Sequence, residues 1–112
     1  MTYKEIATLV DGIGYPYAYY QFEKETAKDP PFICFFYPEN NDFLADNTNY
    51  AHITELTIEL YTDNKDFTAE AAVESALEAA GLVYEKDESY IDSERMYMIT
   101  YTTEVLINVE QD

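Results

Sequence analysis

The sequence predicts an α+β fold, with residues 1–112 forming one domain in the order α-β-β-β-α-β-β. Two segments, 3–11 and 68–80, have the apolar spacing of amphipathic helices. Two others, 53–61 and 95–109, alternate apolar and polar residues as strands do. We therefore expect two helices packed on a mainly antiparallel sheet, and a chain of 112 residues is long enough for one such core.

The first helix is predicted over residues 3–11. Thr2 and Glu5 have the spacing of a capping box. Apolar residues follow at helical spacing: Ile6, Leu9, Val10 and Ile13. Gly12 and Gly14 are expected to close the helix.

Two strands are expected next. Residues 15–23 are rich in Tyr and Phe, and Pro16 favours a strand start or a sheet edge. A polar turn over 24–31 separates them from residues 32–37, which are apolar on both faces. Such a run predicts a central strand covered on both sides, by helices, a loop or another subunit.

Residues 38–50 are rich in Asn and Asp and are expected to form a long loop. The strand 53–61 then alternates cleanly. Its expected inward side chains are Leu56, Ile58 and Leu60, and its outward ones are Glu55, Thr57 and Glu59. Residues 63–66 form a predicted turn.

The second helix, about 68–80, has Thr68 as its expected N-cap and Glu70 in its first turn, where acidic residues are favourable. Gly81 stands where a left-handed residue often follows a helix. The expected inward residues are Val73, Leu77 and Ala80.

The chain is expected to end with a short strand over 82–86, a polar loop over 87–94 and a long strand over 95–109. At ~3.3 Å per residue the last strand would be roughly 50 Å long. We therefore expect either a bulge that bends it or a part that reaches a neighbouring subunit.

Charge narrows the possible partners. The chain has 23 acidic and 6 basic residues, a net charge of −17, although 47% of it is hydrophobic. Its basic residues are scattered singly, so no stripe for phosphate or for an anionic membrane is present. No apolar run approaches the ~20 residues that span a bilayer, and no secretion signal is expected. Cys34, the lone cysteine, fits a reducing cytoplasm.

No residue is assigned to catalysis, a cofactor or a metal. His52 is the only histidine, and we interpret it as structural or solvent-facing because no nucleophile motif accompanies it. Cys34 is interpreted as a small hydrophobic residue. The loop residues Asp42, Asp46, Asn47 and Asn49 lack the spacing of an EF-hand calcium loop. A hydrolase built around His52 and Glu55 is the weakest hypothesis.

Tyrosines gather in one stretch, and tyrosine is enriched at protein interfaces. The candidate interface residues are Tyr15, Tyr17, Tyr19 and Tyr20, with Phe43 and Leu44 of the loop free to dock on a neighbour. Core packing of the tyrosines is the close alternative.

Five strings of the chain together resemble a known family. They are Gly14 to Tyr20 (GYPYAYY), Pro31 to Pro38 (PFICFFYP), Asp46 to Tyr50 (DNTNY), Ile58 to Phe67 (IELYTDNKDF) and Ser93 to Tyr97 (SERMY). In this order they resemble the small tail-completion proteins of siphophages and prophages of Gram-positive bacteria, which are related in fold to the lambda-type tail terminator.

This resemblance implies a homohexameric ring in the virion, assembled in the host cytoplasm without a cofactor. Such a ring caps the tail tube, joins it to the head–tail connector protein and lets DNA pass without specific binding. Glu55 and Glu59 are the candidate acidic residues of its lumen. The competing hypothesis is an acidic DNA mimic that inhibits a host nuclease or restriction enzyme.

Overall fold

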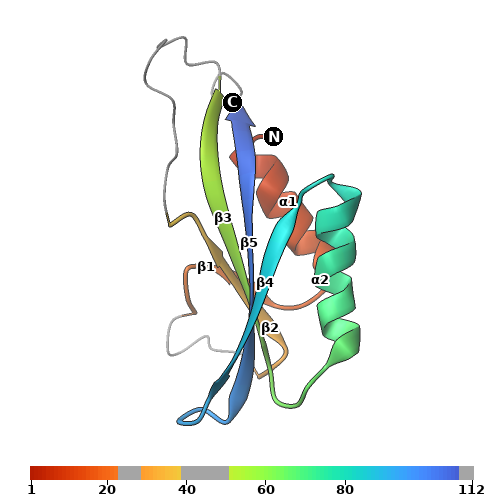
Figure 1. The fold of residues 1–112 in the computed structure, drawn as a ribbon, viewed down its shortest axis with the longest axis vertical. Coiled ribbons are helices and arrows are strands. Elements are labelled where there is room, and N and C mark those ends of the chain that lie inside the picture. The colour runs from red at the N-terminus through yellow and green to blue at the C-terminus, as the bar shows by residue number, and fades with distance from the viewer. Residues whose placement is uncertain (23–28, 39–50, 109–112) are drawn as a thin grey trace.

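A computed structural model of the chain describes residues 1–22, 29–38 and 51–108 (Figure 1). The elements follow the predicted order and confirm the α+β class. They are α1 (Tyr3–Ile13), β1 (Tyr17–Tyr19), β2 (Phe32–Phe36), β3 (Ala51–Thr62), α2 (Phe67–Ala79), β4 (Tyr84–Ile91) and β5 (Met96–Asn108). Most of the loop expected over 38–50, and of the turn expected over 24–31, lies outside the described residues.

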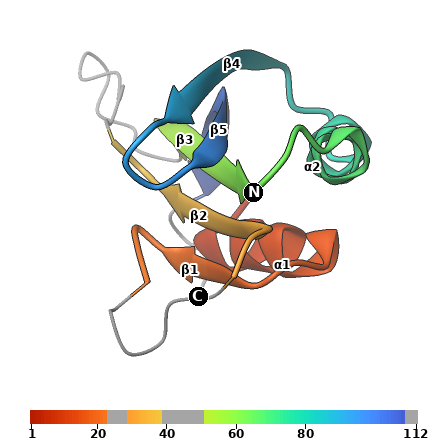
Figure 2. The same ribbon diagram turned by 90° about the horizontal axis from the view of Figure 1, so that it is seen from below.

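The five strands form one sheet in the order β1-β2-β3-β5-β4. Only β1 and β2 pair in parallel, and the other three pairings are antiparallel. Both helices lie on the same side of this sheet (Figures 1 and 2). Among the described residues the other side carries no helix, and β2 lies inside the sheet between β1 and β3, the middle strand of the five. Cover of that side of β2 by a loop or another subunit stays a prediction.

The start of α1 follows the prediction, and the helix ends two residues later than expected, at Ile13. The Glu5 N–H donates to Thr2 Oγ1 (3.1 Å) and the Thr2 N–H donates to Glu5 Oε1 (2.9 Å), which completes the capping box. Gly14 then takes φ 105°, a left-handed conformation that a residue with a Cβ adopts only with strain. Gly12 lies inside the helix.

The N-cap of α2 is Asp66, two residues before the expected Thr68. The Ala69 N–H donates to Asp66 Oδ1 (3.0 Å), and a carboxylate also interacts favourably with the positive end of the helix. At the other end Ala80 is the exposed C-cap, which corrects its inward assignment. Gly81 follows with φ 76°, as predicted.

The long last strand is matched by an equally long β3. Their ladder runs without interruption from Ala51 opposite Asn108 to Thr62 opposite Tyr97. No bulge bends β5 in this stretch, and β3 of the same subunit supplies its partner. The expected bulge is therefore absent from this stretch, and the alternative, a part of the strand that reaches a neighbouring subunit, stays a prediction.

Strand β4 runs from Tyr84 to Ile91, through residues 87–91 that were expected to be loop. Its middle is polar and exposed, so hydropathy gave no strand signal there. Backbone pairing with β5 holds it, from Tyr84 opposite Thr103 to Ile91 opposite Met96.

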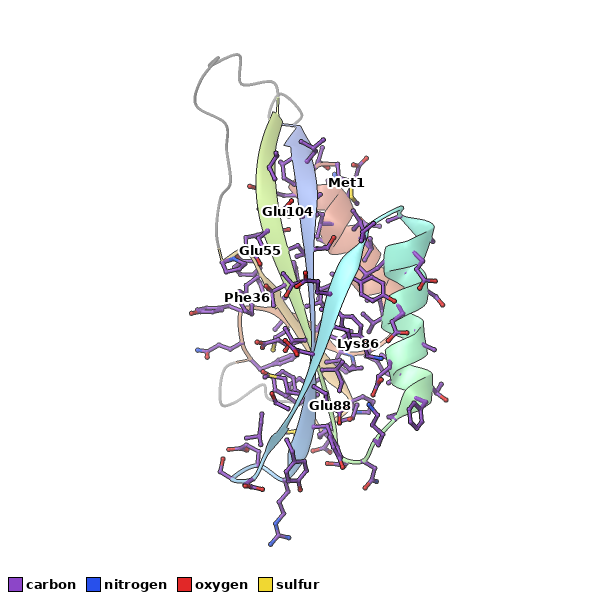
Figure 3. All side chains as sticks on the ribbon, in the orientation of Figure 1. Met1, Phe36, Glu55, Lys86, Glu88 and Glu104 are labelled. Atoms are coloured by element: carbon purple, nitrogen blue, oxygen red, sulfur yellow. The ribbon has the colours of Figure 1, made fainter. Side chains whose placement is uncertain are left out.

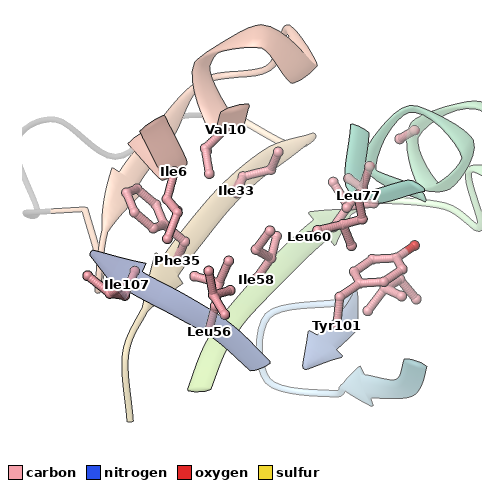
Figure 4. Packing of buried hydrophobic residues seen from close by; sticks show 14 residues of the cluster. Ile6, Val10, Ile33, Phe35, Leu56, Ile58, Leu60, Leu77, Tyr101 and Ile107 are labelled. Atoms are coloured by element: carbon pink, nitrogen blue, oxygen red, sulfur yellow. The ribbon is translucent and has the colours of Figure 1, made fainter. Parts of the chain in front are cut away.

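The core lies between the sheet and the two helices (Figure 4). It includes Ile6 and Val10 of α1, Val73 and Leu77 of α2 and the inward residues of the strands, among them Ile33, Phe35, Leu56, Ile58, Leu60, Ile99, Tyr101 and Ile107. The predicted inward residues of β3 are all fully buried. In β2, Ile33 and Phe35 are buried in this core, whereas Phe32 and Phe36 point to the other face and are half-buried.

Candidate functional site on the open sheet face

The side of the sheet away from the helices is the candidate site, and we call it the open face. Strand pairing fixes its members, because paired residues on neighbouring strands share a face. In β3 these are Ile53, Glu55, Thr57, Glu59 and Tyr61. Phe36 of β2 also belongs to it and points away from the helices (Figure 3).

The open face is negative. It carries two carboxylates from β3 (Glu55, Glu59), two from β4 (Glu85, Asp87) and one from β5 (Glu104). Among the strand residues described on this face, none is Lys or Arg. The field of these groups therefore has one sign over the sheet, and it extends about a Debye length, ~8 Å in physiological salt.

Three of the five carboxylates lie together toward one end of the strands, whereas Glu59 and Asp87 lie at the level of Thr100. Glu55 lies directly opposite Glu104 in the β3–β5 ladder. Thr102, two residues before Glu104 on the same face of β5, pairs with Glu85 of β4. Glu55, Glu85, Thr102 and Glu104 line one hollow of about 610 Å³ beside Val83. Like charges directly opposite one another destabilise a sheet, so folding stability alone does not favour this arrangement.

The other end of the open face is aromatic and contains Glu59. Glu59 is half-buried, lies opposite Cys34 and accepts a hydrogen bond at Oε1 from the Tyr61 hydroxyl (2.7 Å). Burial, and then the charge of Glu59, raise the pKa of the Cys34 thiol to about 11. Cys34 is consequently a protonated, buried thiol near neutral pH. The structure thus separates the two predicted lumen residues, with Glu55 in the acidic part and Glu59 in the aromatic part.

The predicted tyrosine patch is divided between the two sides of the sheet. Tyr17 and Tyr19 lie at the β1 edge on the side of the sheet that faces the helices, and they are 37% and 55% exposed. Tyr15 is half-buried and packs against the core. Tyr20 is 64% exposed and its ring meets Phe36 of the open face at 5.5 Å. Tyr19 and Tyr20 nevertheless line one hollow together with Phe36 and Tyr37. An interface formed by the exposed tyrosines stays a prediction.

The other predicted contact residues, Phe43 and Leu44, lie outside the described residues. So do the candidate calcium residues of the same loop: Asp42, Asp46, Asn47 and Asn49. The backbone of His52 pairs with Ile107 in the β3–β5 ladder, and its side chain is not among those described.

A second charged feature lies between α2 and the sheet, and the sequence did not reveal it. The carboxylate of Glu70 is 3% exposed and contacts Lys65 Nζ at 2.7 Å and Lys86 Nζ at 2.9 Å. Lys86 also contacts Glu74 at 2.7 Å, and the Tyr101 hydroxyl donates to Glu74 at 2.9 Å. Figure 3 shows Lys86 on the side of β4 that faces α2. We call these five residues the Glu70 cluster.

The pKa shifts in this cluster follow from its geometry. Burial alone would raise the pKa of Glu70, but hydrogen bonds from Lys65 and Lys86 outweigh it and hold that pKa below its ordinary value. Hydrogen bonds to Glu74 and Glu70 raise the pKa of Lys86 above its ordinary value. The bonds to Glu70 and Glu88 likewise raise the pKa of Lys65, so Glu70, Lys65 and Lys86 are all charged near neutral pH. The cluster joins α2 to β4, so we assign it to stability rather than to a binding site.

Within residues 1–22, 29–38 and 51–108, no three or more His, Cys, Asp or Glu side chains are placed to hold a metal ion. In the same part of the chain, no helix is long and apolar enough to cross a bilayer.

Comparison of the sequence with protein-family models finds no match, and comparison with curated proteins finds no significant similarity.

Proposed function

We propose that this protein is the subunit of a ring that caps a phage tail tube, joins it to the head connector and lets DNA pass through its opening. The observation that carries the proposal is the open face, a sheet surface with five carboxylates and no described basic residue. The resemblance of the five sequence strings to siphophage tail-completion proteins supports the same function.

The charge of the open face suits a DNA passage. A channel that conducts DNA must not retain it, and phosphate-binding proteins do the opposite by presenting Lys and Arg. Carboxylates such as Glu55, Glu85 and Glu104 repel phosphates at short range. We therefore assign the open face to the wall of the opening, with these three residues in its acidic part.

The architecture also supplies two different surfaces for contacts around a ring. A heterologous ring joins one patch of a subunit to another patch of the next. The outer strands β1 and β4 each have only one strand partner in the described part of the chain. Tyr17 and Tyr19 are exposed beside β1, whereas β4 presents charged side chains. We assign the contacts between subunits to these two edges.

The open face also favours a second candidate, a DNA mimic that occupies the basic groove of a nuclease. Glu85 and Asp87 are two residues apart on β4 and therefore lie on the same face. At ~3.3 Å per residue their backbones are about 7 Å apart. Carboxylates at about this spacing can take the place of DNA phosphates in the basic groove of a nuclease. The two candidates make opposite predictions for the same residues.

A triple variant, Glu55→Gln with Glu85→Gln and Glu104→Gln, distinguishes them. For the ring, we expect capped tails to form, but DNA ejection through them to become slower at low salt, because repulsion in the opening is lost. Raising the salt should remove the difference, since it screens the parent charges as well. The matched control removes three exposed charges elsewhere, by Asp29→Asn, Asp63→Asn and Asp92→Asn, and should eject DNA like the parent.

The same proteins are then titrated against a panel of nucleases and restriction enzymes with DNA present. The ring function predicts no inhibition by any of them. Stoichiometric inhibition by the parent, weakened by salt and lost in the Gln variant but not in the control, would establish the mimic instead.

A further inference from the structure

The aromatic end of the open face forms a pocket of about 630 Å³ whose walls combine aromatic rings with a carboxylate. Its main residues are Tyr20, Phe32, Phe36, Glu59, Tyr61 and Met96. We propose that this pocket binds an arginine side chain of a partner protein. The inference deepens the proposed function and rests on it only for the identity of that partner. In the proposed ring, the partner would be the protein stacked above or below it, the head connector or the tail-tube protein.

The aromatic walls suit a guanidinium group. The rings of Phe32 and Tyr61 stack with centroids 4.8 Å apart and an interplanar angle of 18°, and Phe22 meets Phe32 edge-on at 5.5 Å. Arginine is planar and weakly hydrated, and it stacks on aromatic faces better than lysine does. The aliphatic part of its side chain can pack against Ile91 and Met96, which also line the pocket.

The carboxylate of Glu59 supplies the charge. Tyr61 fixes its position through the hydrogen bond to Oε1, and the half-buried setting lowers the competition from water. Carboxylates bind arginine through two parallel hydrogen bonds, which are stronger than neutral ones. Glu94 adds a second acidic residue to the pocket wall.

Tyr20 lines the pocket and has an unusual backbone conformation. This residue takes φ 73°, a left-handed conformation that is rare for a bulky side chain. The hydrogen bond from the Tyr20 N–H to the Phe35 carbonyl (2.8 Å) secures it beside β2, and the Tyr20 ring contacts Phe36. Strained residues of this kind often mark binding sites, because the surrounding structure maintains them against their preference.

Charge complementarity indicates where the arginine comes from. The chain has a net charge of −17, and its own lysines Lys65 and Lys86 are engaged by Glu70. A basic segment of another protein complements such a surface better than a second acidic copy does. The occupant is therefore an arginine of a different protein, presented to the aromatic end of the open face.

Titration of the intact protein with N-acetylarginine amide tests the pocket directly, with ¹H–¹⁵N NMR as the readout. We expect saturable shifts confined to the pocket residues, with a Kd in the millimolar range because the probe makes a single anchor contact. N-acetylcitrulline amide, uncharged but of similar shape, should bind at least about tenfold more weakly, because the charge-assisted hydrogen bonds to Glu59 are lost.

Two variants separate the pocket from general acidity. Glu59→Gln should weaken arginine binding about tenfold, whereas Glu55→Gln removes the same charge from the same face and strand and should leave Kd within about twofold, since a specific hydrogen-bonded pair far exceeds screened attraction. Equal losses in both variants, or citrulline binding as well as arginine does, would overturn the proposal.

A third variant tests the source of the arginine. Arg95 is the only arginine of the chain and lies in the turn between β4 and β5. If sedimentation shows the parent to self-associate and Arg95→Ala abolishes this, the occupant is a second copy and the assignment to another protein is wrong. Arginine binding without tube capping would refute the ring and leave the pocket intact, so the two proposals fail separately.

Discussion

Phe35→Ala is expected to destabilise the protein by about 3–5 kcal/mol, the usual cost of removing a buried phenylalanine. Phe35 is 6% exposed and lies in the core beneath α1. Its ring also meets Tyr19 edge-on at 5.3 Å, so the truncation removes an aromatic pair as well. Small domains have only about 5–15 kcal/mol of total stability, and urea unfolding of the two proteins would measure the loss.

Phe36→Ala is the matched control for this prediction. Phe36 is the next residue of the same strand, but it is half-buried on the open face. We expect its truncation to cost about 1 kcal/mol, roughly half of the free energy of burying a whole phenylalanine. Equal losses in the two variants would contradict the assignment of the two sides of β2.

Removal of both lysines of the Glu70 cluster, by Lys65→Met and Lys86→Met, has the second-largest expected effect. It leaves the carboxylate of Glu70, 3% exposed, without a cationic partner. Breaking a buried ion pair in this way costs about 3–5 kcal/mol. We expect the lower end, near 3 kcal/mol, because the lysines are 30% and 38% exposed and water reaches the site.

Two further proteins complete this test. Adding Glu70→Leu to the lysine pair removes the buried charge and should recover most of the loss, since an apolar replacement of a whole buried network is often neutral. Lys4→Met, on the exposed face of α1, should change the stability by less than about 0.5 kcal/mol. A triple variant no more stable than the double would argue against the unpaired charge as the cause.

The pH dependence gives an independent readout of the same cluster. The pKa of Glu70 is lower in the folded protein than in the unfolded chain, so between the two values the unfolded chain binds more protons. The contribution of Glu70 is present above about pH 4.5 and is lost as the pH falls through the folded pKa. We expect Glu70→Gln to lose stability near neutral pH and to approach the parent in acid.

Periodicity allowed most of the fold to be predicted. The helical spacing at Ile6 and Val10 and the alternation at Leu56, Ile58 and Leu60 depend on one face being buried, and the structure buries those residues. The errors fall where that signal is weak. The second half of β4, Asp87 to Tyr90, is exposed on both faces, and its backbone pairing with β5 has no hydropathy pattern. The ion pair of Glu88 with Lys65 and the ring contact of Tyr90 with Tyr97 likewise leave no apolar periodicity in the sequence.

The candidate site was less predictable, because it depends on strand register. Glu55 and Glu59 could be identified as outward residues of one strand. Their neighbours Glu104 and Glu85 join them only through pairings with residues about 20–50 positions away in the chain. Glu70 was correctly placed in the first turn of α2, but its burial could not be predicted, because the lysines that pair with it come from two other segments.

Electron microscopy and native mass spectrometry of the protein mixed with purified siphophage tail tubes test the central claim most directly. The tubes should be assembled from the tail-tube protein encoded in the same genome, with tubes alone as the control. The proposed function predicts a ring, a hexamer as the family resemblance implies, at one end of each tube and a matching mass for the complex. Tube ends that stay bare, together with a protein that remains monomeric at every ratio of the two components, would contradict it.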